Sequence, residues 1–237
     1  MSSLFTVPLV LQLLVVVTPD WNSVEGFLYC FERTSPVSSW EAVGIPRRIT
    51  VGKNGMAWGK GLHKHEGPSG KEKVEGDGKA PAGIFSLGPV FGDLDHQVYA
   101  QKMPYLLIEK DLECVDDISS IHYNQFVNAS TYPRDWNSSE KMQEIGDLYS
   151  LGMVIGHNLE PITKGSGSCI FMHIWREASD GTAGCTAMNE QDLKEIVFWL
   201  DQRKKPTLIQ LPIFEYESQI DLLGLPSLND LSPRILK

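Results

Sequence analysis

Short apolar segments that alternate with turn signals fill residues 11–90, and this pattern constrains the fold more than any other feature of the chain. Segments 27–31 and 49–51 are examples, and Asn54-Gly55 then supplies a residue pair typical of a hairpin, because both residues tolerate positive φ. Strands interrupted this often are typical of a β-sandwich or barrel, whereas a parallel α/β sheet needs long helices between its strands. The sequence therefore predicts a mainly β protein.

Composition narrows the classes of partner. The chain has 237 residues, 42% of them hydrophobic, which is enough to bury one large or two small cores and too apolar for a disordered chain. Its formal net charge is −9, whereas phosphate binding needs a concentrated basic surface. We therefore expect a globular protein with no nucleic acid among its partners.

An apolar run over residues 4–17 makes the amino terminus ambiguous. The run is too short to span a bilayer comfortably and is close in length to a signal-peptide core, yet no Lys or Arg precedes it. Its second half, from Leu11 onward, is rich in Val and Leu and ends at Pro19-Asp20, which favours a buried strand. We assign residues 1–10 to an N-terminal segment, a candidate export-signal remnant. No later run approaches membrane length, so we expect no stable membrane insertion.

Helical spacing of apolar residues occurs in two places. One such pattern, preceded by Asn-Ser-Ser-Glu, predicts a helix over residues 137–150. A second pattern predicts a helix over residues 189–202 that stops before Pro206. Residues 208–211 follow as a final strand, and residues 213–237, without strong periodicity, are expected to form a loosely docked C-terminal tail.

Candidate catalytic residues concentrate in residues 165–188. Residues 169–175 alternate as a strand that places His173 among aromatic side chains on one face. A polar loop follows, and Thr-Ala-Gly-Cys at 182–185 then brings Cys185 back beside His173. A thiol next to an imidazole suits nucleophilic catalysis, because the imidazolium favours the thiolate and later protonates the leaving group.

Spacing alone leaves this pair open between catalysis and packing. A strand His is usually a satisfied core residue, and a Cys after a Gly is usually there for packing. In the catalytic interpretation, the backbone of Gly184 approaches the reacting carbonyl, and the N–H groups at 184 and 185 point at the developing oxyanion. We interpret the other cysteines as packing residues and the acidic-basic turn near position 77 as solvated; these residues are Cys30, Cys114, Cys169, Asp77 and Lys79.

Sequence motifs spread over almost the whole chain resemble the L,D-transpeptidase catalytic domain family (YkuD/ErfK-like). They are LLVVVTPDW, LYCFER, VGKNGMAWG, KVEGDGKAPAGIFSLGPVFG, CVDDISSIHYNQFV, SSEKM and GSCIFMHIWREASDGTAGCTAM, and the last is typical of a branch with a T-A-G-C nucleophile motif. The resemblance implies one catalytic domain over residues 11–212, a β-sandwich or barrel-like unit with two or three short helices. It implies that Cys185 is the nucleophile and His173 the base, and that Gly184 and Ala183 form the oxyanion hole.

The resemblance also implies a reaction. Members of the family attack the third residue of a peptidoglycan stem tetrapeptide, release the terminal D-alanine and form a thioester. An amine of a second stem then accepts the acyl group in a 3→3 cross-link, or water accepts it in a carboxypeptidase reaction. Peptidoglycan stem peptides are therefore the expected partner, no cofactor is needed, and the expected location is the cell envelope, periplasmic or extracellular.

The chain departs from the common form of the motif at two positions. Family members commonly have Arg two residues after the Cys and His two residues before it, where this chain has Ala187 and Ala183. Without that Arg, a fixed cation for a stem-peptide carboxylate is missing. Candidate substrate contacts elsewhere are His157, Asn158, Trp175 and Arg176.

Two functions of other classes stay open. His173 and Asp180 have the His-x6-Asp spacing of zinc D,D-peptidases, with His157 as a third ligand. A module that binds peptidoglycan without catalysis would keep the same fold.

Overall fold

The structure is a computed structural model that describes residues 10–63 and 71–228. The predicted N-terminal segment over residues 1–10 therefore lies almost wholly outside the described residues, as does the end of the expected tail.

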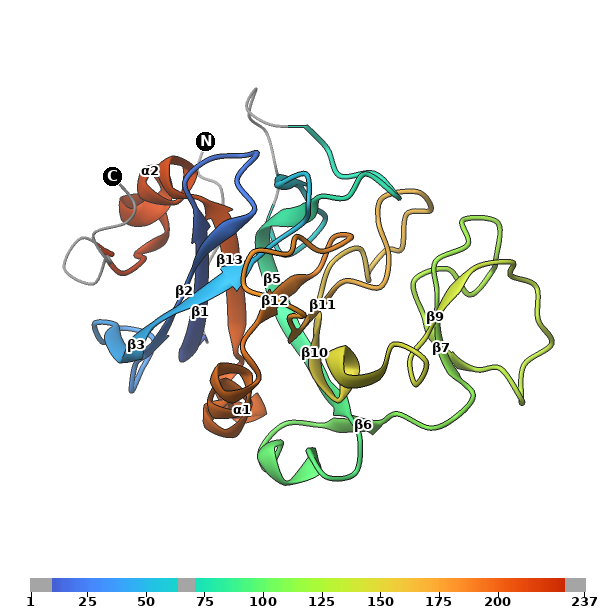
Figure 1. Ribbon diagram of the computed structural model, residues 1–237. Helices are drawn as coiled ribbons and strands as arrows, with labels where there is room; N and C mark the ends of the chain where they lie inside the picture. The colour runs from blue at the N-terminus through green and yellow to red at the C-terminus, as the bar shows by residue number, and fades with distance from the viewer. Residues whose placement is uncertain (1–9, 64–70, 229–237) are drawn as a thin grey trace.

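Ten strands form one large sheet (Figure 1). Its order is β10-β11-β12-β3-β2-β1-β13-β5-β4, with β6 paired to β5. Because β10 also pairs with β5, the eight strands from β10 to β5 close into a barrel-like ring. The mainly β prediction is confirmed. The strands are β1 (Gln12–Thr18), β2 (Glu25–Glu32), β3 (Glu41–Thr50), β4 (Met56–Trp58), β5 (Ala80–Gly92), β6 (Tyr105–Leu107), β10 (Leu151–Ile155), β11 (Phe171–Ile174), β12 (Thr186–Met188) and β13 (Thr207–Pro212).

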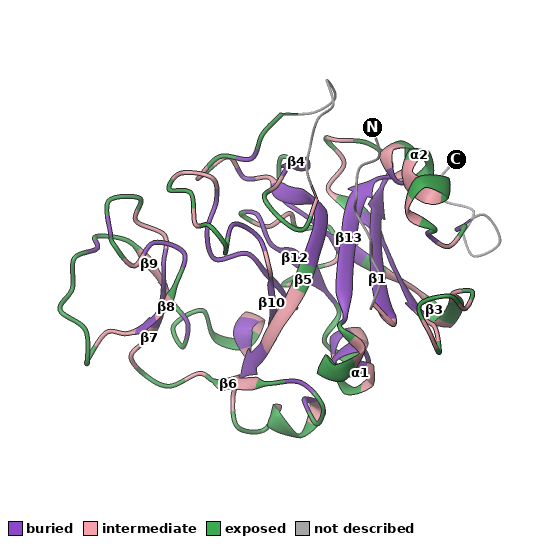
Figure 2. Ribbon diagram, turned by 180° about the vertical axis from the view of Figure 1, so that it is seen from behind, coloured by how far each residue is buried: buried purple, intermediate pink, exposed green. Residues whose placement is uncertain are grey.

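The predicted strands at the two ends of the domain pair with each other. β1 lies between β2, to which it is antiparallel, and β13, to which it is parallel. Every residue of β1 and of β13 is buried, as the purple strands of Figure 2 show. A strand that is covered on both faces needs a continuous apolar run, not an alternation of apolar and polar residues. This explains why the second half of the run at residues 4–17, which forms β1, is apolar without interruption.

Two α-helices accompany the sheet. The predicted second helix is confirmed as α1 (Glu190–Trp199), whose Asn189 side chain accepts the Gln191 N–H at 2.8 Å as an N-cap. The expectation of a loosely docked tail is wrong for its first part, which forms α2 (Ile213–Leu223). α2 contacts β1 and β13, and its Tyr216 side chain is fully buried. The helix ends at Gly224, whose φ of 62° suits glycine.

A separate three-stranded sheet, β8-β7-β9, lies beside the large one, at the right of Figure 1. Its strands are β7 (Leu112–Val115), β8 (Phe126–Asn128) and β9 (Ser139–Lys141). Short 3-10 turns complete the chain: η1 (Gln97–Tyr99), η2 (Gly146–Tyr149) and η3 (Gln202–Lys204).

The prediction of a helix over residues 137–150 is wrong. β9 and η2 occupy this segment instead. The Asn-Ser-Ser-Glu start is used for other contacts, because the Asn137 N–H donates to the Asp117 carboxylate and the Ser138 hydroxyl to Asp116. Glu140 then pairs with Cys114 in the small sheet, and Gly146 at φ 70° breaks the helical run.

The interpretation of Cys114 and Cys169 as packing residues is also wrong, because they form a disulfide. The bond ties β7 of the small sheet to the segment just before β11, across 55 residues of sequence. Cys169 has a φ of 52°, so it lies outside the strand that the alternation predicted, and β11 begins at Phe171.

Within residues 10–63 and 71–228, no helix is long and apolar enough to span a membrane.

Candidate active site

His173 lies on β11, and Cys185 immediately precedes the neighbouring parallel strand β12. In the register of β11 and β12, Met172 pairs with Thr186 and His173 with Ala187, so Cys185 reaches the sheet level with Phe171. The Phe171 N–H donates to the Cys185 sulfur at 3.3 Å, and the thiol donates to the Cys169 carbonyl at 3.6 Å. The backbone therefore returns beside β11, the strand that carries His173, as the sequence predicted.

The turn before Cys185 is held by one hydroxyl. Thr182 Oγ1 donates to the Cys185 carbonyl at 2.6 Å and accepts the Gly184 N–H at 3.1 Å. The Gly184 N–H, a predicted oxyanion donor, is thus engaged by Thr182 in this structure. A methyl group on Gly184 would lie 3.2 Å from the Lys79 carbonyl oxygen and 3.3 Å from Ile170 Cδ1, so a side chain fits poorly here.

His173 has a defined tautomer. Its Nδ1 lies 2.7 Å from the Ile174 carbonyl, which can only accept, so Nδ1 carries the proton and Nε2 is the basic nitrogen. Burial lowers the pKa of His173, although the Ile174 carbonyl favours the protonated ring. The imidazole is therefore neutral at pH 7 and available as a base at Nε2.

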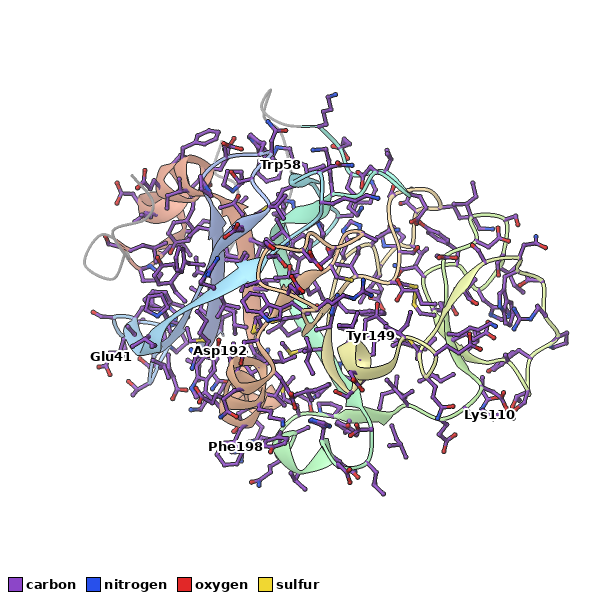
Figure 3. The ribbon with its side chains drawn as sticks, viewed as in Figure 1. Glu41, Trp58, Lys110, Tyr149, Asp192 and Phe198 are labelled. Carbon is purple, nitrogen blue, oxygen red and sulfur yellow. A yellow bond between two sulfur atoms is a disulfide. The ribbon has the colours of Figure 1, made fainter. Side chains whose placement is uncertain are left out.

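Tyr149 joins the two predicted catalytic residues, and sequence reasoning did not assign it a role. It lies at the end of η2, against the large sheet (Figure 3). Its ring centroid is 5.2 Å from that of His173, and its phenol contacts the Cys185 thiol. The hydroxyl donates to Glu140 Oε2 at 2.5 Å. Tyr149 is thus the hub of a Cys185, His173 and Glu140 cluster.

Burial sets the charge states of this cluster. It raises the pKa of the Cys185 thiol to about 12 and that of the Glu140 carboxyl to about 7. It also raises the pKa of Tyr149 well above its usual value. At pH 7 the thiol and phenol are neutral, while Glu140 is close to half-ionised.

A pocket of about 340 Å³ opens beside this cluster, and the buried Cys185 is not among its lining residues. Its lining includes His173 and Ala183, together with Trp175 and Arg176, so the structure brings these four predicted site residues together. The remaining lining residues are Glu140, Ile145, Leu148, Tyr149, Asp180, Gly181, Thr182 and Ala187.

Comparison with known proteins identifies the family. The model of the YkuD family, described as the L,D-transpeptidase catalytic domain, matches residues 20–209. The chain belongs to this family. Because the family acts on the cell wall, membership implies that this L,D-transpeptidase domain is located in the cell envelope.

Two solved structures resemble this domain at low sequence identity. The helical cell shape determining protein Pgp2 from Campylobacter jejuni is 13% identical with a TM-score of 0.41, and the match covers 85% of this chain and 48% of that one. Bd1075 from Bdellovibrio bacteriovorus is 12% identical with a TM-score of 0.42, and the match covers 92% of this chain and 55% of that one. The chain thus spans about half the length of each. The search of curated proteins found no match.

His157 and Asn158 lie apart from the pocket of this L,D-transpeptidase domain. Nδ1 of His157 accepts the Lys60 N–H at 3.2 Å, and Nε2 donates to the Ser166 carbonyl at 2.8 Å. Asn158 bonds to the backbone of Thr163 and Gly167. Burial lowers the pKa of His157 to about 4, so the ring is neutral. Both side chains shape the loop at 158–168, and their role as substrate contacts stays a prediction.

The zinc alternative lacks a ligand set. Among the residues that the structure describes, no group of three or more His, Cys, Asp and Glu side chains is placed to hold a metal ion. His157, the third ligand in that alternative, uses both ring nitrogens on backbone groups.

The turn at residues 73–79 is not the solvated turn that the sequence suggested. Asp77 accepts the Lys73 ammonium at 2.8 Å and the N–H groups of Val74 and Lys79 at 3.0 and 2.9 Å. The Lys79 ammonium donates to the Asn54 carbonyl at 2.5 Å. No pattern in the sequence separates such a hydrogen-bonded, half-buried turn from a solvated one, because the residue types are the same.

Proposed function

We propose that this protein is a cysteine acyltransferase of the L,D-transpeptidase type, with Cys185 as nucleophile and His173 as base. One observation supports the proposal: the Cys185 thiol, just before β12, and a neutral imidazole with a basic Nε2, on the neighbouring parallel strand β11, both contact Tyr149, which lines a pocket together with His173. That arrangement supplies a nucleophile, a proton acceptor and room for a substrate.

The charge states define the first step. Because the thiol is neutral in the resting enzyme, attack on the stem-peptide carbonyl requires transfer of its proton to His173 Nε2. In the resting structure the thiol donates to the Cys169 carbonyl, so the proton must turn away from that oxygen as the substrate enters. The sulfur forms the C–S bond while the carbonyl π pair moves to oxygen.

The tetrahedral intermediate then collapses to a thioester. The C–N bond to the terminal D-alanine breaks, and the departing nitrogen takes the proton from the His173 imidazolium. Gly184 and Ala183 form the oxyanion hole in this proposal, and the Gly184 N–H exchanges its Thr182 hydroxyl partner for the substrate oxygen. An amine of a second stem, or water, attacks the thioester carbonyl while His173 Nε2 takes its proton; the C–S bond then breaks, and the departing thiolate takes that proton from the His173 imidazolium, which restores the thiol.

Peptidoglycan stem peptides are the proposed substrate. Trp175 and Arg176 line the pocket beside His173 and supply an apolar face and an exposed guanidinium for a carboxylate. His157 and Asn158 contribute indirectly through the loop that they hold. We infer a periplasmic or extracellular location from the substrate.

Covalent labelling tests the proposal. The protein is incubated with a carbapenem, and adducts are mapped by mass spectrometry; D-alanine release from a stem tetrapeptide is measured in parallel. We expect one adduct, on Cys185, and D-alanine release that disappears in Cys185→Ala and persists in Cys30→Ala, the matched change at the other free cysteine.

Three results would oppose it. Release that survives Cys185→Ala excludes the thiol mechanism. Release that a chelator abolishes and thiol alkylation leaves intact favours metal chemistry. Binding of stem peptide with neither adduct nor release favours a non-catalytic binding module.

A further inference from the structure

A buried ammonium lies next to the nucleophile loop. The side chain of Lys73 is 3% exposed, and its Nζ is 3.5 Å from the position that a Cβ on Gly184 would occupy. Gly184 immediately precedes Cys185, so the cation lies beside the backbone that carries the thiol. Its positive charge favours the thiolate and lowers the pKa of Cys185 against the larger effect of burial.

Two features fix the ammonium in this place. Asp77 holds Nζ at 2.8 Å and is itself oriented by the Val74 and Lys79 N–H groups. The Lys73 stem runs under Gly167, where a Cβ would lie 2.7 Å from Lys73 Cε. Gly167 also has a φ of 96°, so a residue without a side chain is needed on both grounds.

Such a pair is costly to bury. Removing an ammonium and a carboxylate from water costs several kcal/mol per ion, and mutual attraction often only offsets that cost. A buried cation aimed at a reactive loop is therefore more easily explained by the chemistry of the loop than by the stability of the fold.

The charged and titratable groups around Cys185 come from four elements. Lys73 approaches from the 73–79 turn, Glu140 from β9, Tyr149 from η2 and His173 from β11. Tyr149 and His173 are neutral at pH 7, so the fixed charges that the thiol meets are the Lys73 cation and, on the other side, the partly ionised Glu140. These two charges act on the thiolate in opposite directions.

We propose that Lys73, held by Asp77 beside Gly184, is a positioning residue whose fixed cation stabilises the ionised form of Cys185 during acyl transfer. The proposal rests on the assignment of Cys185 as nucleophile. Lys73 acts through Cys185, and Asp77 limits the effect by neutralising part of the charge.

Alkylation of Cys185 by iodoacetamide, measured against pH and mapped by mass spectrometry, tests the proposal without substrate. Lys73→Met removes the cation, and Lys73→Met/Asp77→Asn removes the whole pair so that no carboxylate is left unpaired. Lys73→Met is expected to label Cys185 about tenfold more slowly at pH 8, because a rise of one unit in the thiol pKa lowers the thiolate fraction tenfold. The double variant is also expected to label more slowly than the wild type, by a smaller factor, because it removes the opposing carboxylate as well. Asp77→Asn keeps the cation and is expected to label faster.

Controls separate a charge effect from a folding effect. Lys71→Met changes an exposed lysine two residues away and is expected to leave the profile unchanged. Equal profiles for the wild type, the folded double variant and Asp77→Asn would overturn the proposal. If Lys73→Met fails to fold, the double variant and Asp77→Asn decide.

The alkylation result is independent of the proposed function. Normal transfer by a double variant with an unchanged alkylation profile refutes the role of Lys73 and leaves Cys185 as nucleophile. A shifted profile in a protein that transfers no acyl group refutes the function instead.

Discussion

The two free cysteines of this domain have nearly the same burial and very different surroundings. Cys30 on β2 and Cys185 before β12 are 4% and 6% exposed, and burial raises the pKa of each thiol to about 12. Each also has one cation nearby, Arg47 for Cys30 and Lys73 for Cys185, and that cation lowers the thiol pKa. Burial and a neighbouring positive charge therefore do not distinguish a nucleophile from a core residue.

What differs is the set of groups that can exchange a proton. Cys30 lies in a strand whose residues 26–31 are all buried, and the hydrogen bond described for its sulfur is to Arg47 Nη1, at 3.9 Å. Cys185 receives the Phe171 N–H and contacts Tyr149, which in turn contacts His173 and Glu140 below a pocket. The proposed nucleophile therefore differs from Cys30 in its contacts with groups that exchange protons and line a pocket, and not in its burial.

The largest expected effect comes from deleting each thiol in turn. Cys185→Ala is expected to reduce D-alanine release at least a thousandfold, about 4 kcal/mol in barrier height, because no other group replaces the nucleophile. Cys30→Ala is expected to keep full activity and to lose about 1 kcal/mol of stability through the missing sulfur. Product assays and urea denaturation measure both. Similar activity losses in the two variants would erase the distinction.

Removing the disulfide is the next test. Cys114→Ala/Cys169→Ala is expected to lower the free energy of unfolding by about 4 kcal/mol, since the cross-link closes a loop of 55 residues. The segment that holds the Cys169 carbonyl against the Cys185 thiol then loses its anchor to β7. We expect faster alkylation of Cys185 than in the wild type, measured as a labelling rate, and no detectable alkylation of Cys30; an unchanged Cys185 rate would show that the anchor does not protect this thiol.

Sequence reasoning succeeded where a local pattern carries the information. The buried strand at β1, the capped helix α1 and the return of Cys185 to the His173 strand each depend on residues close together in the chain. It failed where the partner is distant. Cys114 and Cys169 are 55 residues apart, and the pattern at 137–150 has helical spacing but is drawn into pairing with β7.

The candidate site divides in the same way. Cys185, His173, Trp175 and Arg176 belong to one sequence window, and the structure places the last three in the lining of the pocket, with Cys185 buried behind it against Phe171 and Tyr149. Glu140, Tyr149 and Lys73 come from other segments, and only tertiary folding brings them to the thiol. In the sequence, Lys73 lies in a polar loop and Glu140 and Tyr149 lie in a segment with helical spacing, and neither pattern distinguishes them from solvated neighbours.

Glu140 makes the surroundings of Cys185 dependent on pH, whereas those of Cys30 contain no such group among its described contacts. Burial raises the pKa of the Glu140 carboxyl from 4.5 to about 7. Between pH 4.5 and 7 the folded state therefore keeps a proton that the unfolded state has already lost. That contribution is fully present below pH 4.5 and is lost as pH rises through 7, a decline of about 3 kcal/mol in unfolding free energy. Glu140→Gln is expected to remove this decline, measured by urea denaturation from pH 5 to 8.

The matched control is Glu144→Gln, an exposed carboxylate that pairs with Lys141. Glu140→Gln is also expected to speed alkylation of Cys185, because it removes a negative charge that opposes the thiolate, and to leave Cys30 unchanged. Equal pH dependence in the wild type and Glu140→Gln would show that this carboxyl is ionised throughout the range.

The smallest expected effect tests the cation near Cys30. Arg47 forms ion pairs with Asp192 at 3.5 Å and Glu195 at 3.1 Å, and both carboxylates are partly exposed, so screening limits their contribution to stability. Arg47→Met is expected to cost at most about 1 kcal/mol in urea denaturation. Cys30 alkylation in the folded protein should stay undetectable in both forms, because the strand and not the charge excludes the reagent. If Cys30 is labelled at a rate that depends on Arg47, its dependence matches the one proposed for Cys185 on Lys73. The two pairs of cation and thiol would then be equivalent, and contact with a base would no longer distinguish them.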